Sequence, residues 1–414
     1  MSTLTVTIDR LGAQGHGIAS TAEGPVYVPH ALPGETVAIA RNGSHGALLS
    51  TSAVSPDRVA PICRHFDPDR DACGGCSLQH LAEAPYRAFK RILIVDALRS
   101  KGLAPEVEPL VSCGLGQRRR TVFTARRTDK GLLLGFNRAE TNHIVSIEEC
   151  PVAAPAIVAQ LDALRSVAAS IAGGSESFRL TVLNTLSGLD VAAEGVKPLD
   201  DKRRRAAIET VMRLGAIARV SVNGEILIEP RKPLVDFGGA LVTPPPGAFM
   251  QATKEAEDAM AALVSAHVGK SKRVLDLFAG SGTFALRLAR AARVHAVEGE
   301  DKPLRALDQA ARATQGLKPV TVEKRDLFRR PLTTQELKVF DAVVFDPPRA
   351  GAEAQVRELA RSGVRKVAAV SCTPLTLARD LRLLVDGGYE IRSVVPVDQF
   401  LWSPHVEAVA LLQR

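Results

Sequence analysis

The sequence predicts an α/β fold: an open, doubly wound sheet in residues 246–414, preceded by a small β-barrel in residues 1–58 and a mixed α+β region in residues 59–245. Two observations lead to this prediction. Apolar strands alternate with helices after residue 246, whereas short alternating segments and many glycines fill the first part. The stretch 56–61 and a run of three prolines ending at Pro246 mark the expected boundaries.

Composition indicates a globular protein rather than a membrane or secreted one. The chain has 414 residues, 46% hydrophobic and 24% charged, which suits two or three folded domains. No window approaches the roughly 20 apolar residues that span a bilayer, and the N-terminus alternates like a strand instead of forming a signal-peptide core. Six cysteines in a chain of this length do not suggest a disulfide scaffold. We therefore expect a cytoplasmic protein that does not bind membranes.

The charge distribution favours a polyanionic partner. The net charge is +8 and the pI about 9.3, and the basic residues gather in five clusters. These lie at residues 118–120, 126–127, 202–205, 324–325 and 329–330. Any one cluster is more often a solvated helix face, but five together point to nucleic acid. Aromatic residues make up only 4% of the chain, which argues against broad platforms for stacking single-stranded bases.

The elements of the first two parts follow from their local patterns. The barrel strands alternate apolar and polar side chains and are expected at residues 4–8, 26–28, 37–40 and 47–50. The central part combines a cysteine-rich loop at residues 63–76 with helices and with strands joined by turns. Its helices are expected at residues 85–101, 153–172 and 200–214, and its strands within residues 121–136 and 178–193.

The third part alternates strands and helices, as a doubly wound sheet requires. Apolar strands are expected at residues 274–277, 294–297, 342–345, 367–370, 391–396 and 408–412. A glycine-rich turn and a helix over residues 284–292 follow the first of these strands, and further helices separate the others. Ligands of such sheets bind outside the carboxyl ends of the strands, so the residues that end each strand are the candidates for function.

The glycine-rich turn predicts a nucleotide-type site. The first strand ends at Asp276, and the chain then turns through Gly280 and Gly282, where glycine lets the backbone approach a ligand. The turn also fits the dinucleotide fingerprint G-x-G-x-x-A, so a nicotinamide oxidoreductase is an alternative. Asp276 favours S-adenosylmethionine, because a carboxylate suits a cationic ligand better than a pyrophosphate. Glu298 can accept both ribose hydroxyls, and Asp326 is either an adenine contact or a surface cap, with equal weight.

Two motifs at the same edge predict chemistry on a planar base. Asp346 opens the sequence Asp-Pro-Pro-Arg, whose prolines form a rigid turn that can hold a base while Asp346 binds its polar edge. Cys372 ends the next strand. A free cysteine is most often a buried apolar residue, but this position favours a nucleophile. Thiolate addition to C6 of uracil would make C5 able to attack a sulfonium methyl group.

Such a reaction also needs a base that removes the C5 proton so that the thiolate can leave. Glu407 is the candidate, just before the final strand, although an isolated glutamate there is most often an exposed turn residue. His405 is a weaker candidate for a neighbouring relay group.

The cysteine spacing predicts a metal site. Cys63 precedes a Cys73-x2-Cys76 step, and Cys150 follows much later in a Cys-Pro pair. Four thiolates could hold zinc or an iron–sulfur cluster, and the trailing Cys-Pro favours iron–sulfur over zinc. Cys113 is left over as a buried thiol. The nearby histidines at positions 65 and 80 are more often structural than ligands.

Together these motifs resemble the RNA uracil-5-methyltransferase family. The segments that carry the resemblance are residues 63–80, Cys150, 249–251, 274–283, 346–349, 371–374 and 405–407, in the family's order along most of the chain. Residues 15–19 and 27–35 resemble a TRAM domain, an OB-like RNA-binding barrel. A TRAM domain with a cysteine cluster is more similar to the 23S ribosomal RNA subgroup than to the transfer RNA enzymes. The resemblance implies a Rossmann-like class I methyltransferase domain after the TRAM barrel and the central region.

The resemblance also implies specific roles. It places a [4Fe-4S] cluster on Cys63, Cys73, Cys76 and Cys150 and S-adenosylmethionine on Gln251, Phe278, Thr283, Glu298 and Asp346. Cys372 matches the nucleophile, Glu407 the base and Phe249 a residue of the nucleotide pocket. We add Gly280, Gly282 and Asp326 to the expected cofactor site, and Arg118 and Arg119 to the expected RNA contacts.

The sequence departs from the family pattern at four points. The first gap of the cysteine cluster is longer than usual, Thr373 and Thr283 stand where the family has Asn, and Met250 replaces an aromatic residue. These changes leave the reaction class intact but weaken any assignment of the modified uridine. The leading hypothesis is a monomeric enzyme that methylates C5 of a uridine in ribosomal RNA. A transfer RNA uridine-5 enzyme, an RNA cytosine-5 enzyme, the oxidoreductase and a non-catalytic RNA-binding assembly factor are the alternatives.

Overall fold

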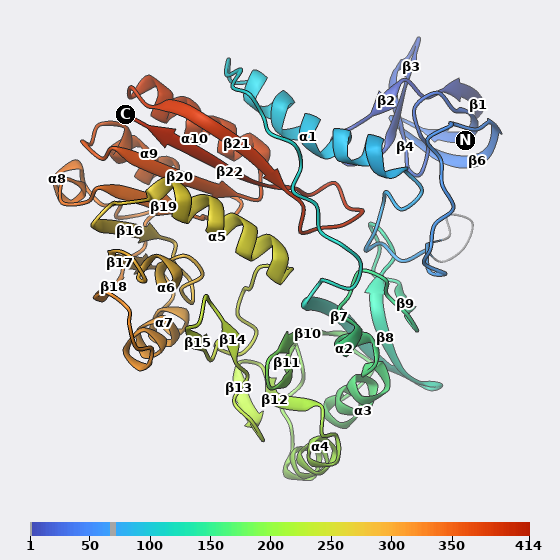
Figure 1. The fold of residues 1–414 in the computed structure, drawn as a ribbon. Coiled ribbons are helices and arrows are strands. Elements are labelled where there is room, and N and C mark those ends of the chain that lie inside the picture. The colour runs from blue at the N-terminus through green and yellow to red at the C-terminus, as the bar shows by residue number, and fades with distance from the viewer. Residues whose placement is uncertain (1, 67–71) are drawn as a thin grey trace.

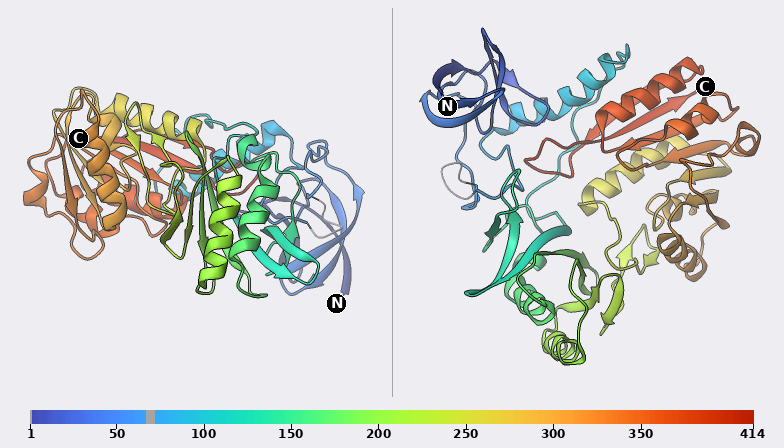
Figure 2. Two further views of the ribbon diagram at one scale, coloured as in Figure 1. Left: turned by 90° about the horizontal axis from the view of Figure 1, so that it is seen from below. Right: turned by 180° about the vertical axis from the view of Figure 1, so that it is seen from behind.

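The computed structural model describes residues 2–66 and 72–414. Met1 and residues 67–71, which belong to the predicted cysteine loop, lie outside the described residues. Figure 1 shows the chain arranged as three sheet-containing regions, and Figure 2 shows the same arrangement from below and from behind. The predicted order of a β-rich, a mixed and a doubly wound part is confirmed; the exact division at residues 58 and 245 stays a prediction.

The first region is a six-stranded sheet with the order β1-β5-β6-β4-β3-β2. Its strands are β1 (Ser2–Thr7), β2 (Arg10–Leu11), β3 (Gly17–Thr21), β4 (Gly24–Val28), β5 (Thr36–Asn42) and β6 (His45–Ala53). Alternate residues such as Val26, Val28, Val37 and Ile39 are fully buried and form a small core of their own. The period-two burial predicted from the sequence is therefore confirmed here.

A long helix, α1 (Glu83–Arg99), connects this region to the C-terminal sheet. Tyr86, Phe89, Lys90 and Ile94 recur at helical spacing and are buried on one face. The helix packs against α10 (Pro374–Asp386) and β21 (Glu390–Val397). Lys90 is the unexpected member of this face, because lysine is almost never fully buried without a partner.

The central region is a seven-stranded sheet with the order β13-β12-β11-β10-β7-β8-β9. Its strands are β7 (Arg120–Thr128), β8 (Gly131–Asn137), β9 (Ile144–Ser146), β10 (Phe178–Thr185), β11 (Gly188–Glu194), β12 (Ile217–Val222) and β13 (Glu225–Ile228). The helices α2 (Pro155–Val158), α3 (Leu161–Ile171) and α4 (Asp201–Arg213) pack on it, and a short pair, β14 (Val235–Asp236) and β15 (Leu241–Val242), follows. The single helix predicted over residues 153–172 is thus two helices, because Gln160 leaves the helical conformation at ψ 17°.

The C-terminal region is the doubly wound sheet, with the strand order β18-β17-β16-β19-β20-β22-β21. Its strands are β16 (Arg273–Leu277), β17 (Arg293–Glu298), β18 (Val320–Lys324), β19 (Ala342–Phe345), β20 (Lys366–Ser371), β21 and β22 (Glu407–Gln413). Its helices are α5 (Lys254–Val268), α6 (Ala285–Leu288), α7 (Asp301–Ala313), α8 (Thr334–Leu337), α9 (Glu353–Ala360) and α10. Strands β16 to β20 are parallel and β22 is antiparallel to both neighbours. Apolar clusters cover both faces, so the fold-class prediction is confirmed.

Two local expectations were wrong. The helix predicted over residues 284–292 is only α6, because the residues after Leu288 continue in tighter i→i+3 hydrogen bonds, such as Ala291 N to Leu288 O at 3.0 Å. Glu407 is the first residue of β22 rather than a turn residue before it. Within residues 2–66 and 72–414, no helix is both long and apolar enough to cross a membrane.

Candidate active site

The candidate residues gather at one edge of the C-terminal sheet. Strands β16, β17, β19 and β20 run parallel, so their carboxyl ends share one edge. This arrangement brings Asp276, Glu298, Asp346 and Cys372 to the same side of the sheet. Cys372 directly follows Ser371, the last residue of β20, as predicted.

The glycine turn has the backbone that the sequence predicts. Phe278, Gly280 and Gly282 all have positive φ, at 59°, 53° and 102°. A Cβ on Gly282 would lie 2.9 Å from side-chain atoms of Leu286 and Leu307, so only glycine fits. Gly280 N donates a hydrogen bond to Glu298 Oε2 at 2.9 Å. The turn and the predicted ribose ligand are therefore joined before any ligand binds.

Asp276 is the least satisfied group at this edge. Its side chain is buried; the backbone N–H of Ala285 lies close enough to lower its pKa, but no described side chain donates to either carboxyl oxygen. Burial raises its pKa well above the usual value, and the Asp346 and Glu298 carboxyls raise it further. A buried carboxylate without a partner is costly, and a cationic ligand in the turn would reduce that cost. The site thus fits a sulfonium-bearing cofactor.

Gln251 connects the segment before α5 to Asp346. Its Nε2 donates to Asp346 Oδ2 at 2.9 Å, and its backbone oxygen accepts from Arg119 Nε at 3.1 Å. Burial raises the pKa of Asp346, and the Gln251 amide opposes that rise. The two residues predicted to bind the cofactor thus contact each other.

Cys372 is half-buried and has few polar partners. Its Sγ lies 3.8 Å from Thr373 Oγ1. Burial raises the pKa of the thiol, the Glu407 carboxyl raises it further and the Thr373 contact lowers it. The thiol therefore starts the reaction protonated at neutral pH, close to the predicted base.

Glu407 is buried, with 2% of its surface exposed. Its Oε1 accepts a hydrogen bond from Gln399 Nε2 at 2.8 Å, whereas no described residue donates to Oε2. Burial raises the pKa of Glu407, followed by the charge of Asp346, while the Gln399 amide lowers it. A carboxyl with a raised pKa and one unused oxygen suits a general base.

The loop between β21 and β22 leads directly into this base, and α1 holds the loop. Lys90 Nζ pairs with Asp398 Oδ1 at 3.0 Å, and both side chains are fully buried. The same ammonium donates to Phe400 O at 3.2 Å and to His405 O. Tyr86 OH donates to Asp398 Oδ2 at 2.5 Å. The base is thus fixed by a helix more than three hundred residues earlier in the sequence.

Trp402 strengthens this anchorage. It has a positive φ of 58°, which is costly for a residue with a side chain. Its N–H donates to Tyr86 OH at 2.9 Å, and its carbonyl oxygen accepts from Ser77 N at 2.8 Å and Leu78 N at 3.0 Å. These three bonds hold the loop against the segment that follows Cys76.

The remaining predicted residues differ in their surroundings. Phe249 is 69% exposed, which leaves its ring free to stack on a base. Asp326 is exposed and its Oδ1 accepts from the N–H groups of Phe328 and Arg329, so it caps a turn. Arg119 is buried against Glu257; its predicted contact with RNA stays a prediction without support from this geometry.

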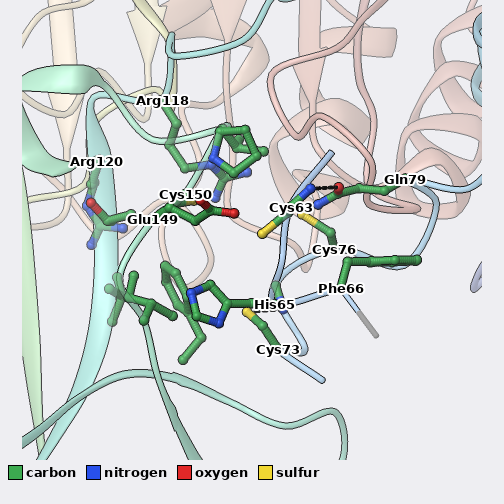
Figure 3. Close-up of a pocket in the computed structure, with 17 residues that line it drawn as sticks. Cys63, His65, Phe66, Cys73, Cys76, Gln79, Arg118, Arg120, Glu149 and Cys150 are labelled. Atoms are coloured by element: carbon green, nitrogen blue, oxygen red, sulfur yellow. Dashed lines mark hydrogen bonds between the residues drawn. The ribbon is translucent and has the colours of Figure 1, made fainter. Parts of the chain in front are cut away.

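The four predicted metal ligands surround one cavity (Figure 3). Its volume is about 240 Å³, and Cys63, Cys73, Cys76 and Cys150 all line it. None of them forms a disulfide. The first three come from the loop before α1 and the fourth from the segment after β9. The sequence spacing thus brings together thiols from two distant segments.

Close packing of the cysteine loop against β8 shapes the cavity. Gly74 lies against β8: a Cβ there would be 2.7 Å from Asn137 O, so this position requires glycine. Burial raises the pKa of Cys73 to about 11 and that of Cys76 to about 12. Within the described residues, no three or more His, Cys, Asp or Glu side chains lie in an arrangement that could hold a metal ion. Four unpaired thiols around one cavity are the donor type that zinc or an iron–sulfur cluster takes.

Arg118 lies between the cavity and the catalytic loop. It lines the cysteine cavity, and its guanidinium lies 5.7 Å from the centre of the Phe400 ring. The histidines near the cluster are not directed to one metal: His65 Nε2 accepts from Glu148 N at 3.1 Å, and His80 is buried beside Phe66. Cys113 lies near Asp398, and burial raises its pKa to about 12.

Sequence reasoning missed two residues of the site, Gln399 and Lys90. Gln399 follows Asp398 at the end of an apolar strand, which is the same signal that identified Asp346 and Cys372. Lys90 gave no signal, because a lysine within an amphipathic helix is usually solvated.

Comparison with known proteins shows the family of the chain. Residues 244–414 match the family model described as tRNA (Uracil-5-)-methyltransferase, and residues 1–40 match the TRAM domain. An RNA methyltransferase of Agrobacterium fabrum, itself uncharacterized, is 66% identical over the whole of both chains. The 23S rRNA (uracil(1939)-C(5))-methyltransferase RlmD of Chromohalobacter salexigens is 32% identical over 99% of this chain and 89% of its own.

A solved structure has the same fold. The tRNA (uracil-54, C5)-methyltransferase of Pyrococcus abyssi, in complex with S-adenosyl-L-homocysteine, superposes with a TM-score of 0.76 over 99% of both chains. The two sequences are 24% identical. This likeness supports the fold and its three regions without deciding the substrate.

Proposed function

The chain belongs to the RNA uracil-5-methyltransferase family, and we propose that it methylates C5 of a uridine in 23S ribosomal RNA. It is an S-adenosylmethionine-dependent enzyme that carries a TRAM domain. The relative with a named target, at 32% identity, acts on 23S rRNA. The single observation that carries the chemistry is the meeting of Cys372, Asp346 and Glu407 at one sheet edge beside the glycine turn.

In the proposed reaction Cys372 is the nucleophile. The thiol loses its proton to solvent, the resulting thiolate adds to C6 of the uracil, and the electron pair of the C5–C6 double bond moves to C5 and O4. S-adenosylmethionine supplies the methyl group that C5 receives. Glu407 then removes the C5 proton through Oε2, the C5–C6 double bond forms again, and the thiolate leaves. The free oxygen of Glu407 and its raised pKa support this assignment.

The cofactor residues follow from the same edge. Gly280 leaves room beside the turn, and Gly282 lets the turn pack closely on Leu286 and Leu307. Glu298 accepts from Gly280 N, and Asp276 supplies the negative charge. Gln251 donates a hydrogen bond to Asp346, and the ring centres of Phe278 and Phe328 lie 5.5 Å apart. We assign Thr283 to the same pocket on the family motif alone, and Asp326 on its position after the third strand, β18.

Cys63, Cys73, Cys76 and Cys150 would hold a [4Fe-4S] cluster. Their convergence on one cavity supports this, as does the absence of any disulfide among them. Bound as thiolates, they would supply a rigid four-point anchor between the loop before α1 and the central sheet. No electron transfer is needed for methylation, so the proposed contribution is structural.

The RNA would contact the TRAM barrel, the central region and the catalytic edge. Exposed Phe249 supports base stacking near Cys372, and Arg118 lies at the junction of the cysteine cavity and the loop. We propose a monomer in the cytoplasm with the three domains at residues 1–58, 59–245 and 246–414. The family assignment disfavours the oxidoreductase reading of the glycine turn.

A transfer RNA target is the second candidate. The matching family model is named for tRNA (uracil-5-) methylation. Mapping 5-methyluridine by mass spectrometry in ribosomal and transfer RNA from a deletion strain separates the two. We expect one 23S rRNA site to lose its methyl group; loss confined to transfer RNA would overturn the ribosomal assignment.

The mechanism has its own test. Glu407→Gln keeps the size and shape of the side chain but cannot take the C5 proton. The variant should therefore accumulate a covalent RNA–protein adduct that survives denaturing electrophoresis. A Glu407→Gln enzyme that turns over normally and leaves no adduct would exclude Glu407 as the base.

A further inference from the structure

The amide of Gln399 connects the cofactor residues to the base. It is 1% exposed and uses all its polar atoms. Its Nε2 donates to Gln251 Oε1 at 2.7 Å and to Glu407 Oε1 at 2.8 Å, while its Oε1 accepts from Ala252 N at 2.6 Å. Such a side chain cannot rotate without breaking several buried bonds.

The residues at the two ends of this chain of hydrogen bonds determine which atom donates in each bond. Ala252 N can only donate, so the atom facing it must be the amide oxygen of Gln399. The NH₂ group then faces Gln251 and Glu407. At the far end Asp346 accepts from Gln251 Nε2, which turns the Gln251 oxygen toward Gln399. The donors and acceptors around each amide therefore determine which of its two terminal atoms is the oxygen and which is the nitrogen.

These bonds make the two carboxyl oxygens of Glu407 unequal. One oxygen, Oε1, is held by Gln399, and the other, Oε2, is left buried with no donor among the described side chains and backbone. The carboxyl plane is thereby fixed, and the free oxygen is the one that can take a proton. We infer that Gln399 is the positioning residue that aims Glu407 Oε2 at the C5 proton and favours the ionised form of that carboxyl by donating to Oε1.

The inference rests on the proposed role of Glu407 and extends it. In the step concerned, the C5–H bonding pair forms the C5–C6 double bond, the C6–S pair returns to Cys372 as thiolate, and the proton goes to Glu407 Oε2. Asp346 faces Glu407 from the end of β19 and opposes its ionisation. Cys372 faces it from β20, with Arg349 near the thiol, but during this step the sulfur is bound to C6 and does not titrate.

The test follows decay of the methylated adduct in single turnover. Gln399→Met keeps the side-chain length and removes both donors. Loss of a hydrogen bond to a charged group changes an equilibrium constant by about tenfold or more. We therefore expect adduct decay to slow roughly tenfold or more at neutral pH. The pH of half-maximal decay should rise by about one unit, so that alkaline pH restores the rate.

Two controls separate positioning from folding. Gln355 is also a 1% exposed glutamine, and its amide bonds to Leu332 N and O, at 2.8 and 3.0 Å, away from the site. Gln355→Met should lower stability and leave adduct decay unchanged. Gln251→Met keeps the bond from Gln399 to Glu407 but removes the donor to Asp346, so it should weaken binding of S-adenosylmethionine and slow adduct decay less than Gln399→Met does.

The outcomes are distinguishable. Wild-type decay in Gln399→Met with a trapped adduct in Glu407→Gln would refute the positioning of Glu407 by Gln399 and leave the base intact. Normal decay in Glu407→Gln would refute the base itself. Where Gln399→Met does not fold, Gln399→Glu replaces it; its second carboxyl faces Glu407 and should slow decay still more, and a wild-type rate would again overturn the inference.

Discussion

Replacement of Lys90 by methionine should release the catalytic loop. Lys90 and Asp398 are both fully buried, and the ammonium also donates to the carbonyls of Phe400 and His405. Methionine fills a similar volume but removes the charge and every donor. Asp398 is then left buried with its charge unpaired, and two loop carbonyls lose their donor.

The expected loss of stability depends on the hydrogen bonds that Asp398 keeps in the variant. Removing one partner of a buried ion pair costs about 3–5 kcal/mol. Asp398 keeps the Tyr86 hydroxyl at 2.5 Å and Phe400 N at 2.9 Å, so we expect the lower end, about 3 kcal/mol. With a urea slope of about 1–3 kcal/mol per molar, the unfolding midpoint should fall by about 1–3 M.

The chain offers a built-in probe. Trp402 is its single tryptophan and lies in the affected loop. Urea unfolding followed by Trp402 fluorescence should show the loss, and methyl transfer should fall in parallel. Lys101→Met, at an exposed lysine just after α1, is the control and should change stability by no more than about 0.5 kcal/mol.

The double variant Lys90→Met/Asp398→Asn tests the electrostatic part. It removes the unpaired charge, so it should recover part of the lost stability. A Lys90→Met enzyme within about 0.5 kcal/mol of wild type, the scale of an ordinary surface change, would refute the anchoring of the loop by this pair. Equal instability in the single and double variants would refute the charge argument.

Four further outcomes are expected. Cys372→Ala should abolish methyl transfer while RNA binding in a filter assay is kept; residual transfer to uridine would contradict covalent catalysis. Because the thiol pKa of Cys372 is raised, the rate of adduct formation should rise from about pH 6 to about pH 9, and a flat profile would contradict thiolate attack. Protein purified without oxygen should absorb in the visible, and Cys73→Ser should lose that band; a colourless, zinc-loaded protein would exclude iron. Gly282→Ala should cost about 1–3 kcal/mol in thermal or urea unfolding and weaken S-adenosylmethionine binding, unlike Gly363→Ala, where a Cβ meets nothing within 4 Å.

Local patterns predicted the parts of the site that lie on the sheet edge. Strand β19 was placed at its observed bounds, residues 342–345, because four consecutive apolar residues between polar ones define a buried parallel strand. The same reasoning placed Asp346 and Cys372 at the carboxyl ends of neighbouring strands. Their roles stay predictions, but their positions followed from periodicity alone.

What the sequence did not predict depends on contacts between distant segments. Lys90 and Asp398 are 308 residues apart, so no window of sequence contains both. Glu407 has a buried environment because β22 inserts between β20 and β21, which local propensity cannot reveal. The length of α6 was overestimated because the shift to tighter turns after Leu288 leaves the helical pattern of apolar residues unchanged.

The loop between β21 and β22 joins every part of the proposed machinery. Gln399 connects it to the cofactor residues, and Lys90 connects it to α1. Trp402 O accepts from Ser77 N and Leu78 N, immediately after Cys76. Four thiolates fixed by one cluster would hold Cys76 in place, and through those two hydrogen bonds they would restrain the loop that leads into Glu407. A structural cluster would thus bear on catalysis through geometry, because the base can take the C5 proton only while the loop holds its one free oxygen in position.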